Sequence, residues 1–100
     1  MTEVVLSALV VVHNEEVQLA DCLELLDFAD ELVVVLDKCT DGSKVIAEEF
    51  NARLVEGAWE IEGHRRNAGL ESCRGAWILE VDADERANPD LGREICSVTR

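Results

Sequence analysis

The sequence predicts an α/β fold: a single domain with a Rossmann-like, doubly wound, mainly parallel sheet. Runs of β-branched and aliphatic residues recur along the chain, and segments with helical periodicity separate them. Polar residues follow most of the apolar runs. A continuous apolar run is typical of a strand covered on both faces, and strands that alternate with helices favour right-handed crossovers and a parallel sheet.

The first half of the chain contains two strands and two helices in this interpretation. Residues 4–12 form the first apolar run, and a helix follows it to about residue 28. Residues 32–36 are the second buried strand. The turn-forming residues 38–42 precede a second helix, which includes residues 45–50.

The second half repeats the alternation less regularly. Residues 52–55 are a short third strand, and residues 56–63 have the composition of a surface loop. A third helix over residues 65–73 leads to a fourth strand at 76–81, which we expect to be buried. Pro89 then begins a last helix, because proline is favoured at the first helical position.

The composition indicates one folded domain and excludes some classes of partner. Of the 100 residues, 48% are hydrophobic and 31% are charged, as in ordinary globular domains. The formal charge is −13, from 22 acidic and 9 basic residues. Binding to nucleic acid or to an anionic membrane needs clustered Lys and Arg, so neither partner is expected.

Cysteine and apolar patterns indicate a cytoplasmic protein. The chain contains Cys22, Cys39, Cys73 and Cys96. They form no CxxC pair and no zinc-ligand spacing, so we expect reduced and mostly buried thiols.

The longest apolar run is too short to cross a bilayer, and no basic region precedes it. We therefore expect no membrane-spanning segment.

Polar residues gather where the predicted strands end, which is where doubly wound sheets bind ligands. The acidic turn, residues 82–85, carries three carboxylates. Oxygen ligands of this kind suit Mg²⁺ or Mn²⁺, although a solvated acidic turn is the alternative. The polar residues after the first, second and fourth strands are His13, Asn14 and Glu15; Asp37; and Asp82, Asp84 and Glu85.

One basic cluster, His64, Arg65 and Arg66, lies at the start of the third predicted helix. Free amides at a helix N-terminus and guanidinium groups both favour anions, so this segment suits a diphosphate. The alternative is an exposed helix that makes surface ion pairs. We interpret Trp59 and Trp77 as core or half-buried anchors.

Taken in order, these segments resemble the family-two inverting glycosyltransferases of the GT-A fold. The resemblance covers about residues 6–91, and the final strand and turn look most like the lipopolysaccharide-core β-glucosyltransferase subgroup. It is carried by VVVHNEE at 10–16, VVVLDKCTDGS at 33–43, RNAGL at 66–70, RG at 74–75 and DADER at 82–86.

The resemblance implies a nucleotide-sugar donor, such as UDP-glucose, and transfer of a hexose with inversion to a glycan or lipid-linked acceptor. Its cofactor would be Mg²⁺ or Mn²⁺ bridging the donor diphosphate. Many members have an acidic residue where Leu36 stands, so Asp37 is that residue or its neighbour. The implied donor-binding residues are Asn14, Glu15, Asp37, Arg66, Asn67 and Asp82, and the implied metal ligands are Asp82 and Asp84.

The resemblance also implies that residues 1–100 are the donor-binding, N-terminal part of a longer enzyme. Members take the acceptor and the general base from a downstream half, so the chain alone is expected to bind donor without efficient transfer. The whole enzyme would act in cell-envelope polysaccharide synthesis, in the cytoplasm or at the inner face of the cell membrane.

Other functions fit the sequence less well. A non-catalytic nucleotide-binding or regulatory module is the alternative that stays open. A dinucleotide-binding oxidoreductase is disfavoured because no GxGxxG follows the first strand. A phosphoacceptor signalling domain would need a lysine opposite the carboxylates, and Lys38 is poorly placed for that role.

Overall fold

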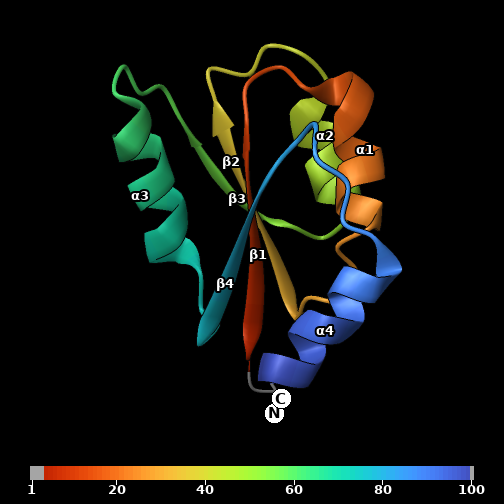
Figure 1. Cartoon of the computed structure of the whole chain (residues 1–100). Coiled ribbons are helices and arrows are strands. Elements are labelled where there is room, and N and C mark those ends of the chain that lie inside the picture. Colours follow the sequence, from red (N-terminus) through yellow and green to blue (C-terminus); the bar gives the residue numbers. More distant parts are fainter. Residues whose placement is uncertain (1–3, 100) are drawn as a thin grey trace.

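The computed structural model describes residues 4–99, in which four strands and four helices alternate (Figure 1). The predicted order of elements is confirmed, although α1 ends earlier and α3 begins earlier than predicted. The elements are β1 (Leu6–Val12), α1 (Glu16–Glu24), β2 (Glu31–Asp37), α2 (Ser43–Glu49), β3 (Arg53–Gly57), α3 (Glu62–Ser72), β4 (Trp77–Asp82) and α4 (Pro89–Thr99).

The strands form one parallel sheet in the order β3-β2-β1-β4. Helices α1, α2 and α4 lie on one side of this sheet, and α3 lies on the other (Figure 1). The chain adds β2 and β3 on one side of β1 and then crosses over to add β4 on the other side. The predicted doubly wound sheet is therefore confirmed, and its winding reverses at β1.

The core has two layers because successive side chains of a strand point to opposite faces of the sheet. Val10 and Val12 of β1 pack on the α1 side with Leu19 and Leu23, whereas Leu9 packs on the α3 side. All five of these side chains are fully buried. Helices on both faces explain why the β1 sequence is continuously apolar rather than alternating.

The fourth strand is predicted to be buried, and this prediction is wrong, because no residue of β4 is buried and only Leu79 and Val81 are partly covered. Trp77 is 49% exposed and Ile78 is 40% exposed. The reason is that β4 is an edge strand of the described sheet, paired with β1, while α3 packs on β1, β2 and β3.

No helix within residues 4–99 is long and apolar enough to cross a membrane.

Candidate functional site

Three loops meet at the carboxyl edge of the sheet, at the top of Figure 1. They follow β1, β2 and β4. Because β1 lies between the other two strands, Asp37 at the end of β2 and Asp82 at the end of β4 are two strand spacings apart, which is about 10 Å sideways. The register also places Asp37 two residues further along the sheet than Asp82. Parallel sheets bind ligands at the point where their winding reverses, and these loops surround that point.

A pocket of about 320 Å³ opens at the end of β2. Asp37 is only 4% exposed there. Its Oδ1 accepts a hydrogen bond from the backbone N–H of Trp59 at 3.0 Å, and its Oδ2 accepts one from Arg65 Nη1 at 2.8 Å. The pocket is lined by His13, Asp37, Lys38, Trp59, Glu60, Glu62 and Arg65.

The contacts of Asp37 decide its charge. Burial by itself raises the pKa of the Asp37 carboxyl, but the hydrogen bonds from Arg65 and the Trp59 amide, with the Arg65 charge, bring that pKa below its usual value. Asp37 is therefore ionised at neutral pH. It holds Arg65 in the pocket, where Arg65 Nε is buried and has no hydrogen-bond partner among residues 4–99.

Arg65, Trp59 and His13 are not among the donor-binding residues that the resemblance implies, yet the structure places all three at this pocket. His13 Nδ1 lies 2.8 Å from the backbone oxygen of Asp37. A carbonyl oxygen only accepts, so Nδ1 carries the proton and the ring orientation is fixed. The Trp59 ring lies against Gly57, where a Cβ would come within 2.5 Å of it.

Asn14 and Glu15 connect the loop after β1 to the loop after β2. Asn14, with a left-handed φ of 50°, accepts a hydrogen bond from the Thr40 N–H through Oδ1 at 2.8 Å. The Glu15 N–H donates to Ser43 Oγ at 3.2 Å. These bonds place both residues at the carboxyl edge. Their contact with a donor stays a prediction.

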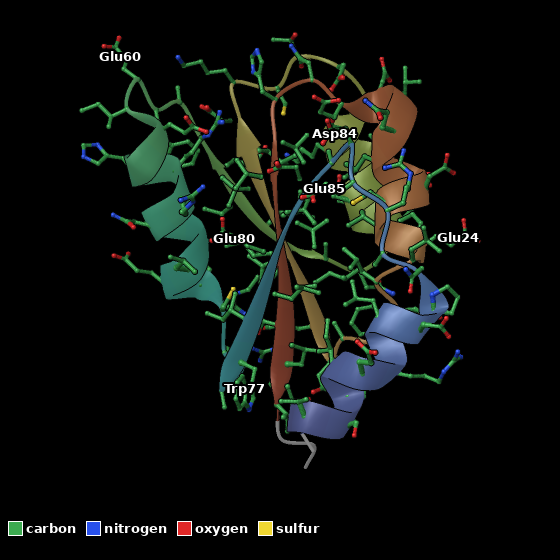
Figure 2. All side chains as sticks on the ribbon, in the orientation of Figure 1. Glu24, Glu60, Trp77, Glu80, Asp84 and Glu85 are labelled. Carbon is green, nitrogen blue, oxygen red and sulfur yellow. The ribbon has the colours of Figure 1, made fainter. Side chains whose placement is uncertain are left out.

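The acidic turn lies at the end of β4, where Figure 2 labels Asp84 and Glu85. Asp82 and Asp84 are exposed, whereas Ala83 between them is buried. Glu85 Oε1 accepts a hydrogen bond from the Asp82 N–H at 2.7 Å. Arg86 Nη1 donates to the backbone oxygens of Ala83 and Glu85, at 2.8 and 2.9 Å.

The donor set of the acidic turn fits a divalent cation shared with a phosphate ligand. Within residues 4–99, no three His, Cys, Asp or Glu side chains converge into a group that could hold a metal by itself. Mg²⁺, however, is usually held by one or two carboxylates together with substrate phosphates and water. Asp82 and Asp84 can supply those two carboxylates from the solvent side of the turn.

The two arginines at the start of α3 have different ion-pair partners. Arg65 points into the pocket and binds Asp37, whereas Arg66 Nε pairs with Glu80 Oε2 of β4 at 3.0 Å. The next residue, Asn67, is exposed. The structure thus brings Arg65, rather than Arg66, to the Asp37 pocket. The donor contacts predicted for Arg66 and Asn67 stay predictions.

Comparison with known sequences gives one consistent family. Residues 7–95 match the sequence profile described as Glycosyl transferase family 2. The lipopolysaccharide core biosynthesis glycosyltransferase LpsC of Rhizobium meliloti is 31% identical over 91 residues, which cover 86% of this chain and 34% of that protein. An uncharacterized glycosyltransferase of Rickettsia bellii is also 31% identical, over 90% of this chain and 31% of its own length. The chain spans about a third of the length of these relatives.

Solved structures show the same architecture. S. aureus TarS 1-349, crystallised in complex with UDP, is 26% identical with a TM-score of 0.76, over 93% of this chain and 31% of that one. Glucosyl-3-phosphoglycerate synthase from Mycobacterium tuberculosis, in complex with Mn²⁺, UDP and glucosyl-3-phosphoglycerate, is 20% identical with a TM-score of 0.71, over 81% of this chain and 34% of that one. The second likeness concerns the fold alone.

Proposed function

The chain belongs to glycosyl transferase family 2, and we propose that it is the donor-binding domain of an enzyme that transfers a hexose from a UDP-sugar. We further propose that the acceptor is a glycan or a lipid-linked glycan and that transfer inverts the anomeric centre. The observation that carries this proposal is the arrangement at the carboxyl edge, where a pocket with an ionised aspartate and an exposed acidic turn flank the strand at which the winding reverses.

The pocket at the end of β2 would bind the nucleoside. Asp37 keeps lone pairs beyond those used by Trp59 and Arg65, so it can accept a further hydrogen bond from a ring N–H of uracil. The His13 and Trp59 rings at the same pocket offer flat surfaces on which a base can stack. The UDP present in the related TarS structure supports a uridine donor.

The acidic turn would hold the diphosphate through a divalent cation. Asp82 and Asp84 would hold Mg²⁺ or Mn²⁺, and Asp82 would also lie near the ribose. When bound, this cation neutralises the charge that develops on the leaving diphosphate. The chain's own part is to fix the two carboxylates at the end of β4, two strands away from the nucleoside pocket at the end of β2.

Transfer itself needs groups that we place outside residues 1–100. We propose that a longer enzyme, of which this chain is the N-terminal part, supplies the general base and the acceptor site. That enzyme would work in the cytoplasm, at the inner face of the cell membrane if its acceptor is lipid-linked. The match to a lipopolysaccharide core biosynthesis glycosyltransferase supports a role in the cell envelope.

Donor binding by the chain can be tested by NMR. Amide shifts would be recorded while UDP is added, with and without Mg²⁺, and Mn²⁺ would then be used for paramagnetic broadening. We expect UDP to shift the amides of Asp37, Trp59 and Arg65. Broadening should centre on the acidic turn and be lost in Asp84→Asn, because the amide that replaces the carboxylate is a poor Mn²⁺ ligand.

Two outcomes would contradict this proposal. If UDP at millimolar concentration shifts no amide at the carboxyl edge, the donor-binding role is excluded. If UDP binds equally well with and without Mg²⁺, and Mn²⁺ broadens amides elsewhere, the metal-dependent transferase is excluded. The chain would then be a nucleotide-binding module.

A further inference from the structure

The three carboxylates of the acidic turn have different contacts in the structure. Glu85 Oε1 accepts a hydrogen bond from the Asp82 N–H at 2.7 Å, and the Glu85 N–H donates to the Asp82 backbone oxygen at 2.9 Å. The two ends of the turn are therefore joined by a reciprocal pair of bonds. Such a pair fixes the backbone of the residues between them.

Arg86 holds the same turn by its backbone. Its Nη1 donates to the carbonyl oxygens of Ala83 and Glu85, at 2.8 and 2.9 Å. Both of these bonds go to backbone oxygens rather than to carboxylates. Because Nη1 carries two N–H groups, this one nitrogen can donate to both peptide oxygens and so fix the direction of both peptide groups.

The inner side of the turn rests on α1. Ala83 and Ala87 are 3% and 6% exposed, and the Cys22 thiol of α1 donates to the Asp82 backbone oxygen at 3.6 Å. With Ala83 held inward, its neighbours Asp82 and Asp84 face solvent. The turn thus has an anchored side and a side that presents two carboxylates.

We propose that Glu85 and Arg86 are positioning residues, which hold the turn so that Asp82 and Asp84 can bind the donor's cation, and that Glu85 is not itself a ligand. This inference rests on the proposed function, because it assigns roles within the same site. Groups that orient the ligands of a metal usually change its affinity about 10- to 100-fold when they are removed.

Substitutions at Glu85 separate a positioning role from a ligand role. Glutamine keeps a side-chain oxygen that can accept from the Asp82 N–H, but it removes the charge that a metal ligand needs. Alanine removes both. A positioning role predicts that E85Q binds Mn²⁺ nearly as the natural chain does, whereas a ligand role predicts that E85Q and E85A both lose it.

The measurement is Mn²⁺ binding at saturating UDP, followed by the electron paramagnetic resonance signal of free Mn²⁺. We expect E85A and R86A to weaken Mn²⁺ binding about 10- to 100-fold and E85Q to weaken it less than about fivefold. Asp84→Asn is the control for loss of a ligand. E24Q is the control for loss of an exposed carboxylate on α1, away from the turn (Figure 2).

Hydrogen exchange of the Asp82 amide gives a readout that needs no metal. We expect this amide to exchange slowly in the natural chain and in E85Q, and faster in E85A. If the natural chain binds no Mn²⁺ with UDP, the proposed function fails, and the exchange rates still decide whether Glu85 fixes the turn. The inference is overturned if E85Q loses Mn²⁺ binding as completely as Asp84→Asn does. It is also overturned if E85A keeps both Mn²⁺ binding and slow exchange of the Asp82 amide.

Discussion

At the scale of single residues, the candidate nucleoside pocket depends on the ion pair between Asp37 and Arg65. The Asp37 side chain is 5% exposed and the Arg65 side chain 25%, so water screens this pair only in part. The backbone N–H of Trp59 provides the other bond to Asp37. Because Arg65 belongs to α3 and Trp59 to the loop before it, one buried carboxylate ties both to the end of β2.

Replacing each arginine at the start of α3 with alanine should give different results. Loss of Arg65 leaves the buried Asp37 carboxylate with the Trp59 amide alone, so we expect R65A to destabilise the fold by about 1–3 kcal/mol and to weaken UDP binding. Arg66 forms an exposed pair with Glu80, which is worth less than about 1 kcal/mol. Urea unfolding and titration with UDP would measure both effects.

The same pair of variants tests the donor contact predicted for Arg66. If R66A weakens UDP binding more than R65A does, Arg66 is the arginine that meets the donor, and Arg65 has a structural role. Arg65→Lys adds a further comparison, because lysine keeps the charge but cannot reproduce the geometry of the guanidinium group.

At the scale of elements, the distance between α3 and the sheet is set by a glycine. A Cβ at Gly69 would lie 2.6 Å from Leu9 Cδ1 and 2.6 Å from Val35 Cγ2, which is closer than packed carbon atoms come. Leu9 and Val35 are themselves fully buried between sheet and helix. Glycine therefore lets the backbone of α3 approach the sheet, and this approach determines where Arg65 reaches Asp37.

Alanine at Gly69 should push α3 away from the sheet. We expect G69A to lose about 1–3 kcal/mol of stability, because overpacking a filled core outweighs the better helix propensity of alanine. We also expect weaker UDP binding, since the Arg65 contact moves with the helix. The measurements are urea unfolding and the amide shifts of Asp37 and Arg65.

Gly63 provides a matched control in the first turn of the same helix. A Cβ at Gly63 meets nothing within 4 Å, so G63A should be neutral or stabilising by up to about 1 kcal/mol. Equal stability of G69A and G63A would mean that Leu9 and Val35 can move aside, and that α3 is not held by close packing at this point.

At the scale of the whole molecule, lowering the pH has two opposing effects on the stability of the fold. The net charge of −13 makes the folded chain repel itself, and acid would relieve that repulsion. Among residues 4–99, however, three carboxyls have a lowered pKa in the fold, although burial by itself raises each one. Hydrogen bonds from Ser7 and Arg74 lower the pKa of Glu31, those from Arg65 and Trp59 lower that of Asp37, and those from Ser43 and Glu16 lower that of Asp41.

The sign of the pH dependence follows from these lowered values. A carboxyl with a lower pKa in the folded state adds stability that is complete above its unfolded pKa of about 4 and is lost as the pH falls through the folded value. At about 0.15 M salt, repulsion between distant exposed charges is screened, so these close contacts should dominate. We expect the free energy of unfolding to be level above about pH 5 and to decrease below about pH 4.

Chemical unfolding between pH 3 and pH 7 would check this expectation. Asp37→Asn should lower the stability at pH 7 and reduce the slope at low pH, because it removes one of the three carboxyls. A natural chain that becomes more stable as the pH falls from 5 to 3 would show that relief of repulsion outweighs the loss of these contacts.

The amino-acid pattern was enough to predict the alternation of strands and helices, the parallel sheet and the edge of the sheet where polar residues gather. The apolar run of β1 and the helical spacing of α1 are local patterns, and each follows from how many faces an element buries. Asp37 and Asp82 could be predicted as site candidates because they directly follow such runs, and Asp84 because it lies two residues after Asp82 in the acidic turn.

Which side chains contact one another across elements could be seen only in the folded chain. Arg65 lies four residues before Gly69, and Arg66 lies four residues before Leu70. Gly69 and Leu70 both pack on the sheet, so helical spacing does not show which arginine reaches Asp37. The apolar sequence of β4 likewise does not reveal that it lies at an edge. Sequence periodicity indicates which residues of one element are buried. The contact of Arg65 and the edge position of β4 depend instead on the distance and angle between elements that are far apart in the chain.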